Sequence, residues 1–139
     1  MNKRFWMAFA ACWVAGQALS FVAHGILMKP SYQALAHLWR PDEVMNSMMW
    51  IMFLSSALLV FVFCFIFTRN YEGKGIMEGV RYGVLIALLA AVPQAVQAFV
   101  VYPIPFTLSV KWAVIGLVYF TVLGAIMAAI YKPDAPAAA

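Results

Sequence analysis

Charge is what this sequence has least of. Only 10% of its 139 residues are Asp, Glu, Lys or Arg, whereas 66% are hydrophobic. A water-soluble globular domain carries about 25% charged residues. The scarcity of charge therefore excludes a soluble domain, and the sequence predicts a single membrane domain over residues 1–139 whose main partner is the lipid bilayer.

Reactive side chains are also few. The two cysteines, Cys12 and Cys64, lie in apolar runs outside any Cys-x-x-Cys or Cys/His metal spacing, so we expect two buried thiols. The chain contains no Walker loop, no Gly-rich dinucleotide fingerprint and no recognisable pair of nucleophile and base. The sequence therefore predicts no catalytic residues, no metal site and no cofactor.

The basic residues give the chain a formal net charge of +4, but they stand singly between apolar runs. A nucleic-acid partner needs a cluster of positive charge, so none is expected. Loops rich in Lys and Arg stay in the cytoplasm. Three basic residues (Lys29, Arg40 and Lys111) fall on one side of the membrane, and six fall on the other: Lys3, Arg4, Arg69, Lys74, Arg81 and Lys132. This asymmetry predicts a multi-pass protein with both termini in the cytoplasm.

What the chain does have is four long apolar stretches. Each reaches the roughly 20 residues that an α-helix needs to cross the hydrocarbon core. We expect an all-α integral membrane bundle of four transmembrane helices. Their approximate ranges are 5–27, 44–67, 75–102 and 108–130. Asn2, Lys3 and Arg4 resemble the start of a secretory signal, but the apolar run that follows exceeds a signal core, so a retained helix is expected.

The segments between the spans are short. Residues 31–39 carry Tyr32 and Trp39 at helical spacing, which predicts a short interfacial helix in the first outer loop. A charged cytoplasmic connector covers residues 69–81. We expect a loose tail over residues 132–139.

Small residues recur every fourth position in the third predicted span, at Gly75, Gly79, Gly83, Ala87 and Ala91. Such a strip lets two membrane helices approach closely. A second strip, which includes Gly16 and Ser20, runs along the first span and could face the first strip. These patterns predict that the third span is the packing centre of the bundle, with a kink at Pro93.

Polar side chains within the spans form a candidate polar site, made of Gln17, Ser55, Ser56, Gln94, Gln97 and His24. Polar groups are costly in lipid unless they are paired, so they should turn inward. Two interpretations remain open at this point. The layer either joins helices through hydrogen bonds or forms a small site for a substrate or water.

Two further pairs have functional and structural interpretations. His24 and His37 could supply axial ligands to a haem, or His24 could bind a quinone with nearby Trp and Tyr. Glu78 and Arg81 lie three residues apart and could form an ion pair at the cytoplasmic threshold, either as an anchor or as a gate.

Several motifs at loops and helix ends resemble those of an uncharacterised family of small bacterial four-helix inner-membrane proteins. They are His24-Gly25, Leu38-Trp39-Arg40-Pro41, Tyr71-Glu72-Gly73-Lys74-Gly75, Glu78-Gly79-Val80-Arg81-Tyr82-Gly83, Tyr102-Pro103-Ile104-Pro105 and Lys111-Trp112. The resemblance covers nearly the whole chain. It implies a location in the bacterial inner membrane but no activity and no catalytic residues.

Three functional hypotheses follow. The first is a non-enzymatic accessory subunit of a larger membrane assembly, bound to other membrane subunits or to itself. The second is a small oligomeric transporter or channel that uses the Gln/Ser layer. The third is a redox subunit that binds haem or quinone near His24.

Overall fold

The computed structural model describes residues 2–132, so the predicted tail lies outside the described residues from position 133 onward. The chain within this range is helical and contains four helices long and apolar enough to cross a membrane. This confirms the predicted all-α fold with four candidate spans. The spans are Lys3–Leu27, Asp42–Arg69, Ile76–Val101 and Phe106–Ile130.

Two of the spans are interrupted by wider π-helical turns. The first comprises α1 (Lys3–Ser20) and the π-helix η1 (Phe21–Leu27). The second span is the single helix α3 (Asp42–Arg69). The third comprises α4 (Ile76–Ile86), the π-helix η3 (Ala87–Ala91) and α5 (Val92–Val101). The fourth is α6 (Phe106–Ile130).

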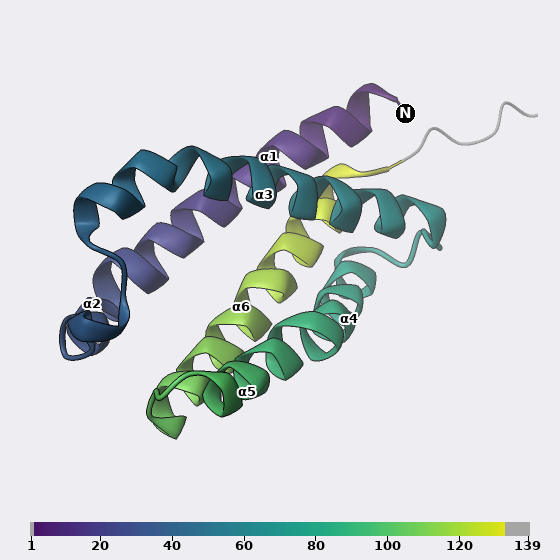
Figure 1. The fold of residues 1–139 in the computed structure, drawn as a ribbon. Helices are drawn as coiled ribbons and strands as arrows, with labels where there is room; N and C mark the ends of the chain where they lie inside the picture. The colour runs from purple at the N-terminus through teal and green to yellow at the C-terminus, as the bar shows by residue number, and fades with distance from the viewer. Residues whose placement is uncertain (1, 133–139) are drawn as a thin grey trace, which may run out of the picture.

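The loop between the first two spans forms two short helical pieces rather than one helix over residues 31–39. They are α2 (Lys29–Gln33) and the 3-10 helix η2 (Ala36–Leu38). Their placement in a membrane interface stays a prediction. We call the end of the bundle that carries this loop the α2 end, and the opposite end, where the chain starts and α6 finishes, the terminal end (Figure 1).

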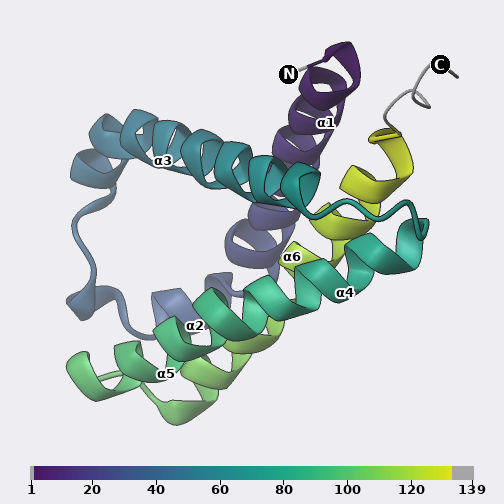
Figure 2. The same cartoon turned by 90° about the vertical axis from the view of Figure 1, so that its right-hand side faces the viewer.

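The fourth span, not the third, is the packing centre. Helix α6 lies between the α4–η3–α5 span on one side and α1 on the other (Figures 1 and 2). The small residues of the third span do form a packing face, but that face meets α6. The prediction that the third span occupies the centre was therefore wrong.

The contact between α4 and α6 is as close as two backbones allow. A Cβ atom on Gly79 would lie 1.9 Å from the carbonyl oxygen of Gly124, and one on Gly83 would lie 2.1 Å from that of Phe120. Only glycine fits at such positions, as expected for helices that pack through small residues. Ala87 continues this face and is fully buried.

The strip on α1 also faces α6 rather than the third span. Cys12 is buried and its thiol donates a hydrogen bond to the Leu123 carbonyl, with an S···O distance of 3.4 Å. Gly16 lies beneath the Tyr119 ring, and a Cβ atom there would come within 2.6 Å of the Tyr119 hydroxyl. The small-residue spacing identifies the packing face but not the helix that covers it.

Gly75 does not belong to the packing face. It precedes α4 as the N-cap residue with φ of +76°, and a Cβ atom there would meet nothing within 4 Å. The four-residue spacing extends back to Gly75, which precedes the first residue of α4 and does not have helical backbone angles. The prediction for Gly75 was therefore wrong, and its glycine suits the turn instead.

Helix α3 is buried only in its second half. No residue is buried before Val60, whereas Val60, Phe63, Cys64 and Phe67 are buried. The Tyr82 hydroxyl joins this half to α4 by donating to the Phe63 carbonyl at 2.6 Å. The first half diverges from α5 toward the α2 end (Figure 2).

Glu78 holds the connector at the terminal end by a different contact from the one expected. Its carboxylate accepts hydrogen bonds from the backbone N–H groups of Glu72 and Lys74, both at 2.6 Å. Arg81 instead donates from Nε to the Met77 carbonyl at 3.2 Å. The predicted ion pair between Glu78 and Arg81 is therefore not formed, because the connector folds back over the first turn of α4 and occupies the carboxylate.

Candidate functional site: a capped cavity at the α2 end

A cavity of about 800 Å³ lies between η1, α3, α5 and α6. Its lining is mostly apolar and contains no Asp, Glu, Lys or Arg. The polar or aromatic side chains around it are Ser20, His24, Tyr32, Ser56, Gln94, Tyr102, Trp112, Tyr119 and Phe120. An apolar cavity with a few polar groups on its wall is the usual form of a small-molecule site.

The two π-helical segments border this cavity. In η1 the backbone N–H of Met28 donates to the Ala23 carbonyl, five residues back, at 2.8 Å. In η3 the N–H of Val92 donates to the Ala87 carbonyl, also five residues back. Both segments contribute lining residues, among them His24 and Ala91. Because π turns are rare and frequently occur at functional sites, two of them along the wall of one cavity make it the candidate functional site.

Pro93 explains one of the two π turns. It is the second residue of α5 and has no N–H to donate to the preceding turn, so the helix before it has to rearrange its hydrogen bonds. The sequence predicted a disturbance at this position. The other π-helix, η1, contains no proline.

Three side chains form a hydrogen-bonded cap at the α2 end of the cavity. The indole N–H of Trp112 donates to the Tyr32 hydroxyl oxygen at 2.9 Å. The same oxygen lies 2.6 Å from Nδ1 of His24, and the His24 and Tyr32 rings stack with 9° between their planes. The indole N–H of Trp39 donates to the Tyr32 backbone carbonyl at 3.2 Å, which fixes Tyr32 from the other side.

Hydrogen-bond donors and acceptors in the cap suggest a tautomer for His24. Trp112 can only donate, so it occupies one acceptor position of the Tyr32 oxygen and leaves the Tyr32 O–H free to donate to Nδ1. A neutral His24 then carries its proton on Nε2. Burial raises the pKa of Tyr32 above its usual value, with the Trp112 hydrogen bond acting in the opposite direction, so Tyr32 remains a neutral donor.

The predicted polar site divides into two parts. Ser56 accepts hydrogen bonds from Gln17 at 2.7 Å and from Trp13 at 3.2 Å, and it donates to the Phe53 carbonyl at 2.9 Å. Its capacity is thus fully used in joining α1 to α3. This part agrees with the interpretation of the layer as interhelical hydrogen bonding.

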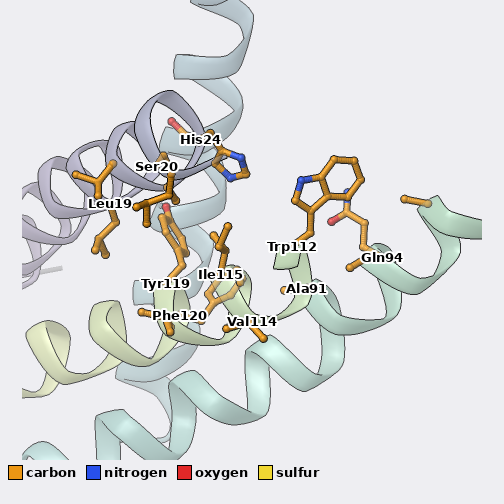
Figure 3. Close-up of a pocket in the computed structure, with 18 of the residues that line it drawn as sticks. Leu19, Ser20, His24, Ala91, Gln94, Trp112, Val114, Ile115, Tyr119 and Phe120 are labelled. Carbon is orange, nitrogen blue, oxygen red and sulfur yellow. The ribbon is translucent and has the colours of Figure 1, made fainter. Parts of the chain in front are cut away.

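The remaining predicted residues are dispersed. Gln94 is exposed but lines the cavity from α5, across from His24 (Figure 3), and Ser20 lines it from the end of α1. Ser55 and Gln97 are exposed and do not line the cavity. The expectation that every member of the layer turns inward was wrong, because α3 and α5 each present a face to the surroundings at this depth.

Tyr32 and Trp112 were not recognised as a site from the sequence. Tyr32 and Trp112 stand at helix ends, which is typical of aromatic residues at a membrane boundary and gives no hint that they hydrogen-bond to each other. Tyr119 rises from α6 toward α1 and contributes its ring to the cavity wall (Figure 3). His24 was singled out, and its proximity to Tyr and Trp was the useful signal.

The two histidines are in different settings. Both histidines are exposed, but His24 lines the cavity, whereas His37 in η2 does not. Among the described residues 2–132, no three His, Cys, Asp or Glu side chains gather in a group that could hold a metal ion.

Comparison with known proteins gives no further guidance to the role of this cavity. The chain matches no protein-family model, and neither a curated protein nor a solved structure is significantly similar to it. The site therefore has to be interpreted from its own chemistry.

Proposed function

We propose that the protein is a non-enzymatic membrane protein that binds one neutral amphipathic molecule of the bilayer. The apolar part of this molecule occupies the cavity between η1, α3, α5 and α6, and its polar end meets the His24–Tyr32–Trp112 cap. The observation that carries the proposal is the combination of a hydrogen-bonded cap with an uncharged lining in one cavity of about 800 Å³.

The absence of charge in the lining supports a neutral ligand. A buried ion without a partner is strongly disfavoured, because its desolvation is not compensated. A transporter for ions through the Gln/Ser layer receives less support, because Ser56 is already saturated by Gln17, Trp13 and Phe53.

The proposal places the protein in the bacterial inner membrane with both termini in the cytoplasm, so that the capped end faces the opposite side.

A matched pair of substitutions on α3 tests this proposal. Leu59 lines the cavity, whereas the neighbouring Leu58 does not and is 66% exposed. Native mass spectrometry of protein extracted from its own membranes would measure the retained lipid. We expect one neutral lipid per chain in the wild type and in Leu58→Trp, with at least about tenfold lower occupancy in Leu59→Trp. Equal retention by the two variants, or no retained lipid in the wild type, would refute the proposal.

The second candidate function is that of an accessory subunit in a larger membrane assembly. It is favoured by residues 42–59 of α3, which include no buried position and in which Trp50 is 61% exposed. The size of the particle extracted in mild detergent tests it. Co-migration with a large complex supports a subunit role, and a single chain or a small oligomer of this chain alone contradicts it.

A further inference from the structure

We propose that the bound molecule is of the quinone class, a neutral ring with an isoprenoid tail, and that His24 donates a hydrogen bond from Nε2 to a ring carbonyl. This inference rests on the proposed function and specifies its ligand. Four features of the cavity lead to it: its electrostatics, its donors, its aromatic wall and its opening.

The electrostatics exclude the commonest membrane lipids as ligands. Phospholipid head groups carry a phosphate, and an anion of this kind requires Lys, Arg or a cluster of backbone donors. The lining includes no cationic side chain. Lys111, the cation nearest in sequence to the cap, donates instead to the Ser31 hydroxyl at 3.1 Å and does not line the cavity. The head group is therefore neutral.

The donors of the cap suit a carbonyl acceptor. With Nδ1 engaged by the Tyr32 hydroxyl, a neutral His24 keeps Nε2–H as a donor, and His24 is one of the residues that line the cavity. Figure 3 shows His24 on one side of the space, with Trp112 and the amide of Gln94 across from it. A ring with carbonyl oxygens on opposite sides can accept from His24 at one end and from the Gln94 amide at the other.

The wall favours a flat ring over the flexible ester head of a diacylglycerol. Trp112, Tyr119 and Phe120 all line the cavity. Aromatic rings prefer offset-stacked or edge-to-face contacts with another ring, and such contacts add to the effect of burial. The rest of the lining is predominantly aliphatic or small, which matches a branched hydrocarbon chain.

The opening gives the tail a route into lipid. Helix α3 contributes only Ser56 and Leu59 to the lining, and its preceding residues are exposed and turned away from α5. The divergence of α3 from α5 is plain in Figure 2. A long tail can leave between these two helices while the ring remains below the cap.

The test uses the full-length protein in phosphatidylcholine nanodiscs and two probes, decylubiquinone and dioctanoylglycerol. Quenching of Trp fluorescence reports quinone binding, and competition against decylubiquinone reports binding of the glycerol lipid. We expect decylubiquinone to bind the wild type, His24→Phe to weaken its binding about tenfold, as loss of one hydrogen bond predicts, and the control His37→Phe to leave it unchanged. A His24→Gln variant, which keeps an N–H donor, should recover part of the loss.

Infrared spectroscopy of ¹³C-labelled quinone supplies a second measurement that does not depend on affinity. We expect the band of one carbonyl to shift to lower frequency in the wild type and the shift to disappear in His24→Phe. Equal affinity and an unchanged band in His24→Phe would overturn the assignment to His24. Binding of dioctanoylglycerol without decylubiquinone, with sensitivity to Leu59→Trp measured by native mass spectrometry, would overturn the quinone inference and leave the proposed function standing. Failure of both probes, together with no retained lipid in the wild type, would overturn both.

Discussion

The two ends of the bundle are built on opposite principles. At the terminal end, α4 and α6 approach until the backbone of one touches that of the other at Gly79, Gly83 and Gly124. At the α2 end a cavity lies between η1, α3, α5 and α6, and α3 stands apart from α5 (Figure 2), although α5 stays joined to α6 by the hydrogen bond from the Ser109 hydroxyl to the Ala95 carbonyl at 2.6 Å. The residues at the contact account for the difference, because lipid provides no hydrophobic reward for closing a gap and only small residues allow dispersion contacts between backbones.

The terminal end is therefore the rigid part of the molecule, and the α2 end holds the space for a ligand. Aromatic contacts reinforce the close end, where Phe63, Phe67 and Tyr82 pack against one another. The open end has aromatic contacts as well, in the cap of His24, Tyr32 and Trp112, but its cavity is bordered by π turns in two spans. The terminal end thus stabilises the fold, and the α2 end leaves room for a bound molecule.

The largest effect is expected at the close end. Gly83→Leu places its first side-chain carbon where the Phe120 carbonyl oxygen already lies, at 2.1 Å. We expect the free energy of unfolding to fall by at least about 3 kcal/mol, since neither backbone can yield cheaply. Unfolding in SDS, followed by circular dichroism, measures it.

Gly25→Leu serves as the matched control for that substitution. A Cβ atom on Gly25 meets only the Phe21 side chain, at 3.3 Å, and Gly25 is exposed. We expect a change below about 1 kcal/mol. Similar losses for Gly83→Leu and Gly25→Leu would mean that the contrast between the ends does not govern stability.

A smaller effect is expected from one hydroxyl at the close end. Tyr82→Phe removes the hydrogen bond to the Phe63 carbonyl and should lower the free energy of unfolding by about 1 kcal/mol. Tyr102→Phe, which alters an exposed tyrosine at the open end, should change it by less than about 0.5 kcal/mol. The same unfolding assay compares them, and a larger loss for Tyr102→Phe would reverse the assignment of rigidity.

Hydrogen exchange should resolve the contrast along a single span. We expect backbone amides of η3 to exchange at least about tenfold faster than those of α4, because π turns have poorer local packing and open more readily. Mass spectrometry of the ligand-free protein in nanodiscs gives the rates. Uniform protection from Ile76 to Val101 would show that the π turn is as rigid as the helix before it.

The smallest effect on the free energy of unfolding is expected when a larger side chain, rather than a ligand, fills the cavity. Leu59→Trp adds volume at a position that is 45% exposed, so it should change the free energy of unfolding by less than about 0.5 kcal/mol. A small change in the free energy of unfolding for Leu59→Trp and a large one for Gly83→Leu would support the contrast between the two ends. A destabilisation above about 2 kcal/mol would indicate that the cavity is already closed in solution.

The sequence was sufficient for the four spans and for the helix faces that pack. Apolar runs of the right length predicted the helices, and the spacing of Gly79, Gly83 and Ala87 predicted a close contact. The partner of that contact could not be predicted, because a small-residue strip fits any helix of matching shape. Gly75 was misassigned because periodicity carries no information about where a helix begins.

The candidate site was only partly predictable. His24 and Gln94 were recognised as polar residues in apolar spans. Their role depends on the cavity between them. Its presence depends on how all the surrounding side chains pack, which the sequence pattern of one helix does not reveal. The partner of Glu78 was equally unpredictable from the sequence. The Glu78 carboxylate binds backbone N–H groups of the connector, because the connector folds back over α4, and it does not pair with Arg81.

The π turns of η1 have a consequence for how the chain can change. A π turn is equivalent to one residue inserted into an α-helix, and one residue corresponds to a rotation of about 100° around the helix axis. Deleting a single residue within Phe21–Leu27 would restore ordinary helical winding, leave Cys12 and Gly16 packed on α6, and turn the part of η1 that follows the deletion by roughly a quarter of a turn about the helix axis. The residues of the first span that pack on α6 and the residues that line the cavity thus belong to separate stretches of one span, so a one-residue change within η1 can alter the cavity wall and leave the contacts of Cys12 and Gly16 with α6 in place.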